Sequence, residues 1–154
     1  MTEPSRPPYQ AYATIAGTFF GGLAAVAALS RRSPPSNPLE FVALAAATFK
    51  VSRTLSREKV GSFVRQPFVE GDADTGEDEQ PAGTGFQRVI GELVTCPRCL
   101  GTWSAAVLVS TEMLSPRFGR LLTWSLGASA ANDFLQAGFA ALCAKANQFE
   151  DEAP

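Results

Sequence analysis

The stretch from Tyr9 to Leu29 constrains this sequence most, because its 21 residues include no charged side chain. As an α-helix it would be about 31 Å long, which matches the hydrocarbon thickness of a lipid bilayer. Two arginines and a proline-rich segment follow at 31–38, and they would end the helix in a polar layer. The pattern predicts a first transmembrane helix at 9–29, preceded by a short N-terminal tail, 1–8.

A cleavable signal peptide is the alternative for this stretch, since Ala-Val-Ala at 25–27 resembles a small-residue cleavage site. Against it, the apolar run is longer than a typical signal peptide core, and the single cation of the leader, Arg6, is offset by Glu3. These features favour a retained helix.

Three later segments, 39–55, 97–115 and 121–144, are also long and mainly apolar. They predict an all-α, polytopic helical membrane protein with about four transmembrane helices, its membrane domain at 9–145 and an acidic C-terminal tail at 146–154. The second segment contains Lys50 and Arg53, so three spans are the alternative. The central segment, about 70–85, is rich in Asp, Glu, Gly and Pro, and this composition predicts a disordered acidic loop.

Charge and composition exclude several classes of function. The chain has 13 Lys and Arg against 15 Asp and Glu, a formal net charge of −2, so it has no general basic field for binding nucleic acid. It contains no His, which excludes His-dependent catalytic triads and the zinc motifs built on paired histidines.

The distribution of cations predicts how the four helices are oriented. In a four-span arrangement, nine of the 13 cations fall on the side that holds both termini and the central loop. They are Arg6, Lys50, Arg53, Arg57, Lys59, Arg65, Arg88, Arg98 and Lys145; the other side has Arg31, Arg32, Arg117 and Arg120. The positive-inside rule therefore places both termini in the cytoplasm.

The turn Cys96-Pro97-Arg98-Cys99 is the feature with the most chemical potential. Two thiols at this spacing can share a metal ion, form a redox-active disulfide, or occupy a tight helix entry, and the spacing does not choose between them. A closed zinc site needs four ligands, so it would have to recruit Cys143 and Glu92. An antiparallel hairpin of the last two spans would bring Cys143 to the depth of the turn. A structural turn is the default interpretation.

Asp133 lies near the middle of the fourth predicted span, where an unpaired carboxylate costs about 3 kcal/mol on insertion scales. The cations of the second span, Lys50 and Arg53, are the expected partners in a structural ion pair, with Arg53 preferred. Proton or ion conduction is the alternative use of such an acid, although one deep acid is a poor basis for a transporter.

Small residues at four-residue spacing predict close helix packing. They occur on the first predicted helix as Gly17, Gly21 and Ala25, and on the fourth as Gly127 and Ala131. The sequence leaves open whether this packing is within one chain or between chains.

One segment resembles a known family. Its most specific residues are Gly91, Glu92, Leu93, Cys96, Pro97, Cys99, Gly101 and Trp103. With the cation-bearing segment at 49–55 and the helix that carries Asp133, this pattern resembles the domain-of-unknown-function family 1360 (DUF1360) over about 41–141. The resemblance implies a small integral protein of the bacterial cytoplasmic membrane and a special role for the cysteine turn. The family brings no assigned activity, and Arg98 stands where its members often have an aromatic residue.

The features together favour a non-catalytic subunit, scaffold or assembly factor of a membrane complex, in contact with the lipid bilayer and with other membrane subunits or further copies of itself. The first alternative is a cytoplasm-facing metal-binding protein, with zinc held by Cys96, Cys99, Cys143 and Glu92. The second is a membrane thiol oxidoreductase that uses the cysteine turn. A soluble helical domain that buries its apolar segments in a partner is the remaining alternative.

Overall fold

The structure is a computed structural model that describes residues 8–31, 37–71 and 79–151, with side chains as far as Gln148. Its main elements are helices, as the sequence predicts: α1 (Tyr9–Leu29), α2 (Pro38–Arg57), α4 (Phe86–Thr95), α5 (Pro97–Leu114) and α6 (Pro116–Asp151). Between α2 and α4 the described chain forms three short helical turns, η1 (Lys59–Gly61), α3 (Ser62–Arg65) and η2 (Gln66–Phe68). Two short strands follow, β1 (Val69–Glu70) and β2 (Gln80–Pro81).

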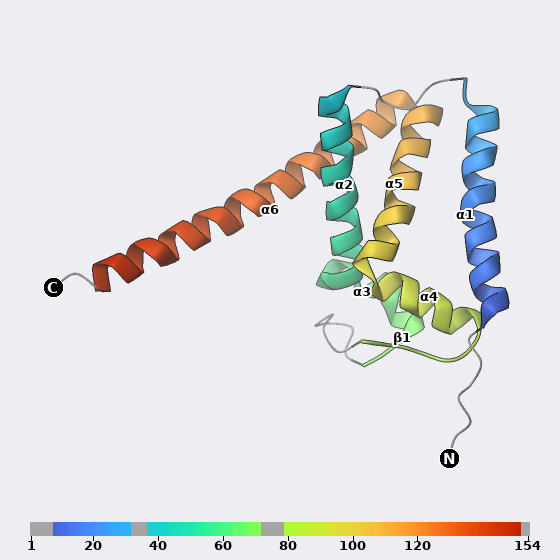
Figure 1. The fold of residues 1–154 in the computed structure, drawn as a ribbon, viewed down its shortest axis with the longest axis horizontal. Helices are drawn as coiled ribbons and strands as arrows, with labels where there is room; N and C mark the ends of the chain where they lie inside the picture. The colour runs from blue at the N-terminus through green and yellow to red at the C-terminus, as the bar shows by residue number, and fades with distance from the viewer. Residues whose placement is uncertain (1–7, 32–36, 72–78, 152–154) are drawn as a thin grey trace, which may run out of the picture.

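Helix α2 is the centre of the fold, because it packs against both α5 and α6. Figure 1 shows α1, α2 and α5 standing side by side, with α4 lying across one end of them. The buried centre of the bundle consists of Leu44, Ala47 and Leu108, surrounded by partly buried apolar side chains of α5 and α6. Helix α1 stands at the edge, where it contacts α5 and α4.

The start and end of α2 follow from its sequence. The side chain of Asn37 accepts a hydrogen bond from the amide of Leu39 at 2.9 Å, and Pro38 occupies the first helical position, where its missing N–H costs nothing. At the other end the chain becomes extended at Glu58, whose amide still donates to the carbonyl of Thr54. The helix therefore covers 38–57 and contains the predicted segment 39–55.

The predicted spans 97–115 and 121–144 imply a polar turn between them at about 115–120, and this turn is wrong, because only Ser115 separates α5 from α6. Pro116 fits the first position of a helix, so α6 begins there. Gly119 makes the sharp reversal sterically possible: a Cβ atom at this position would lie 2.5 Å from the Cα of Glu112 on α5. Helix α6 also continues through most of the predicted tail to Asp151, and residues 152–154 lie outside the described chain.

The close approach of α2 and α6 confirms one of the predicted packing glycines and corrects its partner. A Cβ at Gly127 would lie 3.0 Å from the carbonyl oxygen of Ala43, so the two backbones touch. Ala131, however, is exposed, and Ala130 is fully buried instead. Thr123, Gly127 and Ala130 are spaced by four and three residues, which places them on one helical face, whereas Ala131 lies 100° further around.

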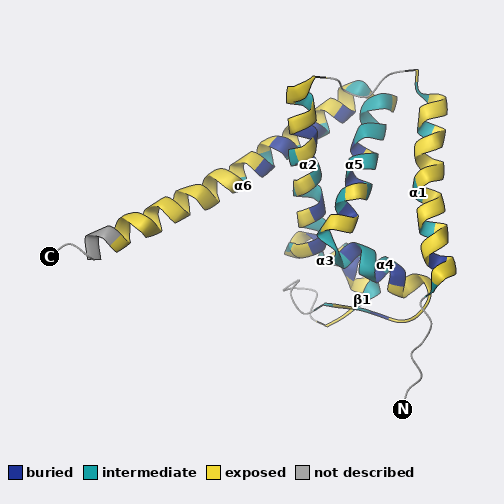
Figure 2. Ribbon diagram, viewed as in Figure 1, coloured by how far each residue is buried: buried dark blue, intermediate teal, exposed yellow. Residues whose placement is uncertain are grey.

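The small residues of α1 have no such role within the chain. Gly17, Gly21 and Ala25 are exposed, and a Cβ at either glycine would have no neighbour within 4 Å. Figure 2 shows that α1 is exposed along nearly its whole length.

The prediction of disorder at 70–85 is wrong at both ends of the segment. Val69 and Glu70 pair with Pro81 and Gln80 as a two-stranded antiparallel sheet, and Ala82 donates a backbone hydrogen bond to Phe68 at 2.9 Å. Residues 72–78 lie outside the described chain. At the described ends the order comes from packing, because β2 contacts α4 and Glu79 pairs with Arg65 of α3.

Among the described helices, α1 alone is long and apolar enough by composition to cross a membrane unaided. Helices α4 and α5 satisfy the same criterion only as a pair, which is bent by 89° at the break between them. A signal sequence or the core helix of a soluble protein can have the same composition, although none of the apolar window of α1 is buried.

We predict that Gly127→Val lowers the free energy of unfolding by about 1–3 kcal/mol, because the added side chain must push α6 away from Ala43. Gly21→Val is the matched control on an open helix face, and it should change stability by less than 1 kcal/mol. Thermal or denaturant unfolding of the purified chain in detergent measures both. Equal effects of the two substitutions would show that α2 and α6 do not touch at this point.

Candidate functional site

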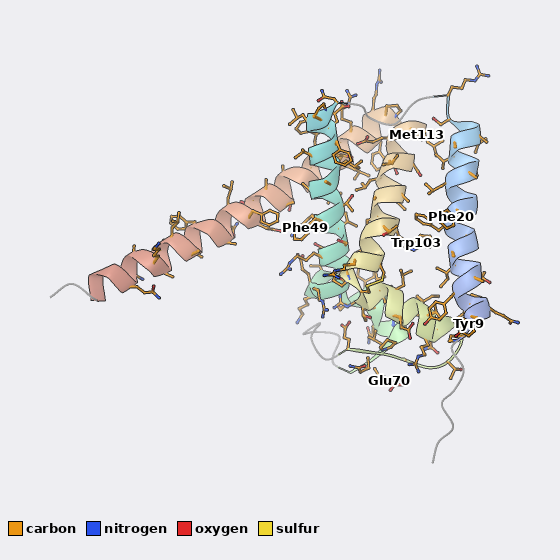
Figure 3. All side chains as sticks on the ribbon, in the orientation of Figure 1. Tyr9, Phe20, Phe49, Glu70, Trp103 and Met113 are labelled. Atoms are coloured by element: carbon orange, nitrogen blue, oxygen red, sulfur yellow. A yellow bond between two sulfur atoms is a disulfide. The ribbon has the colours of Figure 1, made fainter. Side chains whose placement is uncertain are left out.

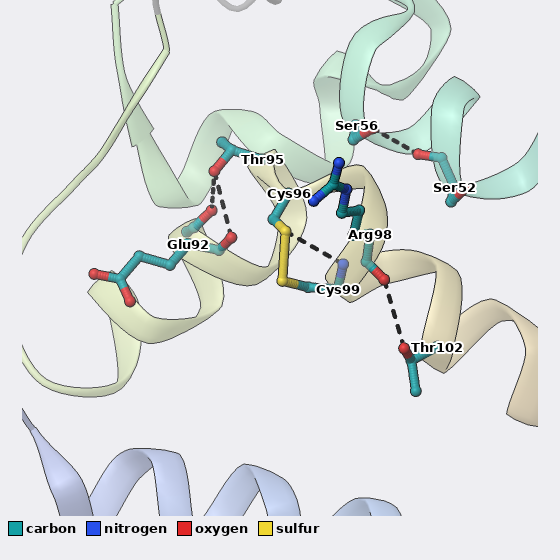
Figure 4. The surroundings of a disulfide bond; sticks show 9 residues. Ser52, Ser56, Glu92, Thr95, Cys96, Arg98, Cys99 and Thr102 are labelled. Atoms are coloured by element: carbon teal, nitrogen blue, oxygen red, sulfur yellow. Dashed lines mark hydrogen bonds between the residues drawn. A yellow bond between two sulfur atoms is a disulfide. The ribbon is translucent and has the colours of Figure 1, made fainter. Parts of the chain in front are cut away.

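The cysteine turn lies at the elbow between α4 and α5 (Figure 4). Cys96 is the single residue between the two helices and adopts an extended conformation, with φ −100° and ψ 103°, which turns the chain. Pro97 then begins α5, as the sequence predicts, because its fixed φ suits the first helical position. The motif residues Cys96 and Pro97 thus have a clear local role as helix cap and helix start.

The two cysteines of the turn are joined as a disulfide, with their Cα atoms 5.3 Å apart. The amide of Cys99 donates a hydrogen bond to the sulfur of Cys96 at 3.2 Å, so this sulfur also caps the N-terminus of α5. Cys99 is exposed and Cys96 is half-buried. Cys99 is therefore the more accessible of the two cysteines, whereas the sulfur of Cys96 accepts a backbone hydrogen bond.

The structure does not assemble the four-residue metal site expected from Cys96, Cys99, Cys143 and Glu92. Within residues 8–31, 37–71 and 79–151, no group of three or more Cys, Asp and Glu side chains is placed to hold a metal ion. The expectation required α6 to run back along α5, but α6 crosses α2 and its C-terminal half leads away from the bundle (Figure 1). Cys143 lies on that outer half as an exposed, free thiol.

Glu92 serves as a link between helices. Its carboxylate accepts a hydrogen bond from the hydroxyl of Tyr12 on α1, and a charged one from Arg88 at 3.2 Å on its own helix. This contact fixes the N-terminal end of α1 against α4. The motif glutamate is therefore placed to orient α1, and both of its oxygens are already engaged.

The motif glycines allow close approach of neighbouring chain segments. A Cβ at Gly91 would lie 2.4 Å from the carbonyl oxygen of Phe68, so only glycine lets α4 pack on η2. Gly101 faces Ser52 of α2 at an ordinary contact distance of 3.9 Å. The remaining motif residue, Trp103, packs edge-on against Phe19 of α1, with ring centroids 5.1 Å apart, and Figure 3 shows this side chain between α5 and α1.

The carboxylate of Asp133 pairs with a cation of α2, as predicted, but this cation is Lys50 and not Arg53. Lys50 contacts Asp133 at 2.9 Å and Glu58 at 3.1 Å, and Glu58 also accepts from the hydroxyl of Thr54 at 2.9 Å. Arg53 lies on the same side of α2 but is exposed, and Lys50 makes the contact with Asp133 in its place. Beside the pair, Phe49 stacks on Phe134 at 5.3 Å. Together these contacts hold α6 where it leaves the bundle.

The most deeply buried charge of the described chain was missed by the sequence analysis, which counted Arg65 only among the cations of the cytoplasmic side. Its side chain is 0% exposed and contacts the 2% exposed Glu79, with its Nε 2.8 Å and 2.9 Å from the two carboxylate oxygens. Its guanidinium also donates to the carbonyls of Leu55 and Glu58 at 2.8 and 3.0 Å. Arg65 therefore joins the end of α2 to the segment before β2. The opposite charges 14 residues apart were visible in the sequence, but nothing in the pattern selected this pair from the neighbouring acids.

We predict that Glu79→Gln lowers the free energy of unfolding by about 3–5 kcal/mol, because it leaves the buried guanidinium of Arg65 without its counter-charge. Glu70→Gln, on the adjacent exposed strand position, is the control and should change stability by less than about 0.5 kcal/mol. Denaturant titration in detergent compares them. Equal unfolding midpoints for the two variants would contradict the buried pair.

Comparison with known proteins agrees with the sequence motif. The family described as "Protein of unknown function (DUF1360)" matches residues 43–139. The Sporulation protein YjcA of Bacillus subtilis (strain 168) is 32% identical over 92 residues, which cover 56% of this chain and 78% of that protein. No solved structure is significantly similar. The match spans α2, the cysteine turn and most of α6, and the chain belongs to the DUF1360 family.

Proposed function

We propose that this chain is a multi-pass protein of the bacterial cytoplasmic membrane that acts as a non-catalytic subunit, scaffold or assembly factor. The observation that carries this proposal is the amount of large apolar surface that the bundle leaves uncovered. Soluble monomers rarely expose contiguous apolar patches of more than a few hundred Å². Here large apolar side chains are exposed at several positions of α1 and of the outer half of α6. Figure 2 shows that both segments are exposed along most of their length.

The exposed side chains are large as well as numerous. On α1, Phe20 is 68% and Leu29 76% exposed, and on α6 Leu135 is 72% and Phe139 70% exposed. Every described residue of α6 beyond Asp133, from Phe134 to Gln148, is exposed. Lipid tails or the helices of a membrane partner would cover these surfaces. We therefore assign the lipid bilayer and other membrane subunits, or further copies of the chain, as the partners.

The four-span topology is supported by the arrangement of the helices. Helices α1, α2 and α5 lie side by side, and Lys50, a half-buried cation between α2 and α6, is neutralised by Asp133 and Glu58. A paired charge of this kind is the form in which ionisable groups occur inside membranes. With the cation distribution, this arrangement favours cytoplasmic termini.

The charged groups that meet between elements serve to hold those elements together, which favours a scaffold over an enzyme. Lys50 with Asp133 fixes α6 to α2, Glu92 fixes α1 to α4, and Arg65 with Glu79 fixes the end of α2. A scaffold needs such fixed helix positions so that its outer surfaces keep one shape for a partner. The YjcA name connects that relative with sporulation. The structural role proposed for this chain rests on the contacts above and not on that name.

The topology is tested with cysteines near the two ends of the predicted span 121–144, in a variant without the turn cysteines (Cys96→Ser/Cys99→Ser). Cys143 is exposed beyond the bundle, and Ser115→Cys, combined with Cys143→Ser, places an exposed thiol at the opposite end. We expect a membrane-impermeant maleimide to label Cys143 only in inside-out vesicles and Ser115→Cys only in intact spheroplasts. Labelling of both from the same side would contradict a spanning α6.

The scaffold role itself is tested by purification from native membranes with mass spectrometry. We expect a partner membrane protein, or a second copy of the chain, in fixed stoichiometry, and we expect Asp133→Ala to reduce its recovery because α6 loses its contact with Lys50. Arg53→Ala is the matched control, because it removes an exposed cation from α2, the helix that carries Lys50. A monomeric chain that is soluble without detergent would contradict the proposal.

A thiol-redox role is the second candidate, favoured by the disulfide at the N-terminus of α5. A thiolate of a partner protein would attack the exposed sulfur of Cys99, form a mixed disulfide and release Cys96 as a thiolate, which the Cys99 amide stabilises. A second partner thiolate would then release Cys99, so the partner is oxidised and the turn reduced.

Trapping variants distinguish this role from a structural disulfide. In a Cys143→Ser background, we expect the free Cys99 thiolate of Cys96→Ser to attack the disulfide of the oxidised partner and to release one partner sulfur as a thiolate. The mixed disulfide has no Cys96 thiol to resolve it, so it should accumulate as a reducible band on non-reducing gels. Cys99→Ser should trap several-fold less, because Cys96 is half-buried. Failure of both variants to trap a partner would assign the disulfide a structural role only.

A further inference from the structure

A basic hollow lies at the beginning of α6, at the end of the bundle where α1 and α5 end and α2 begins. Its volume is about 440 Å³, and the described residues that line it are Pro116, Arg117, Arg120, Leu121 and Trp124. None of these residues belongs to the cysteine turn or to the ion pairs described above. The scaffold role does not use this hollow.

The charge of the hollow is positive. Arg117 and Arg120 are three residues apart on α6, so both guanidinium groups lie on one side of the helix. A single carboxylate of the described chain, Glu40 of α2, approaches them, and it is 3.6 Å from Arg120, which is a loose contact. Glu112, the other nearby acid, instead accepts a hydrogen bond from the buried hydroxyl of Thr123. Two guanidinium groups therefore line the open cavity, and the ion pair recorded for them within the described chain is the loose one with Glu40.

Two apolar lining residues, Leu121 and Trp124, lie deeper along the helix than the arginines. Leu121 follows Arg117 by four residues and Trp124 follows Arg120 by four, so each apolar side chain lies one turn below an arginine. Leu121 is 63% exposed and Trp124 45% exposed. The order is cationic at the end of the bundle and apolar toward its middle. A phospholipid has the same order, with a phosphate followed by glycerol and acyl chains.

We propose that this hollow binds the headgroup of an anionic phospholipid, with its phosphate between Arg117 and Arg120 and its glycerol and upper acyl carbons against Leu121 and Trp124. Guanidinium groups bind phosphate oxygens through paired, charge-assisted hydrogen bonds, and an indole ring suits the boundary between headgroups and tails. A free phosphate would engage only the arginines and leave the apolar half uncovered. The two arginines of the lining select an anionic lipid over a zwitterionic one, because a zwitterionic headgroup would bring its own ammonium group close to them. This inference rests on the proposed membrane location.

The fluorescence of Trp124 reports directly on the hollow once Trp103 is replaced by Phe, because the chain has two tryptophans. The purified full chain in an uncharged detergent is titrated with short-chain phosphatidylglycerol, with the matching phosphatidylcholine, and with inorganic phosphate. We expect a saturable change with phosphatidylglycerol, at least tenfold weaker binding of phosphatidylcholine, and no saturable change with phosphate. Arg117→Gln/Arg120→Gln should weaken phosphatidylglycerol binding at least tenfold.

Arg53→Gln is the matched control, since it removes an exposed arginine from the other end of α2, and it should leave binding unchanged. The double variant is compared with the parent by thermal unfolding, so that lost binding is not confused with lost structure. Equal binding of the two lipids, unchanged binding by a folded double variant, or a full response to inorganic phosphate would each overturn the proposal. A response to an acidic peptide in place of lipid would do the same. Because this titration is carried out in detergent, its failure is distinct from a failure of the thiol topology experiment.

Discussion

The fold depends on how closely other helices approach α2. The residues that α2 buries are small or of moderate size, and they include Ala43, Ala47, Ser52 and Ser56. Small side chains let α6 approach until Gly127 nearly touches a backbone carbonyl, and let α5 place Gly101 against Ser52. Dispersion contacts between backbones then replace the bulky apolar core that a soluble bundle of this size would need. The buried hydroxyl of Ser56 causes no penalty, because it donates to the Ser52 carbonyl of its own helix at 2.6 Å.

Ionic contacts add direction to this packing. Small smooth surfaces can slide along one another, whereas a charged pair fixes one register. Lys50 is placed where α2 and α6 separate, so its contact with Asp133 sets the position at which α6 leaves the bundle. Arg65 holds the C-terminal end of α2 to the segment before β2, because it donates to two carbonyls near that end and to Glu79. These two ionic contacts therefore fix the relative positions of elements that apolar contact alone would leave variable.

Helix content and the cysteine motif were predictable from sequence because both are local. Uninterrupted apolar runs predict helices, and Pro97 marks the start of α5 whatever surrounds it. Partner choice was not predictable in the same way. Lys50 and Arg53 are both cations of α2, and only the crossing of α2 and α6 decides that Lys50 faces Asp133. The order at Glu79 was missed for a related reason: composition describes a segment by itself, whereas the cation that orders this one comes from α3.

The same distinction explains why α6 was predicted too short and in the wrong direction. Helix length follows from local sequence, but a polar stretch such as 116–120 is compatible both with a loop and with the exposed first turn of a helix. Gly119 decides the matter, since its missing side chain lets α6 begin directly against Glu112. Once α6 begins there, its crossing with α2 carries residues beyond Asp133 away from the cysteine turn. Cys143 and Cys96 are thereby separated by the same geometry that uncovers Phe134, Leu135, Phe139 and Leu142. The loss of a compact metal site and the gain of an apolar surface for a partner thus have one structural cause.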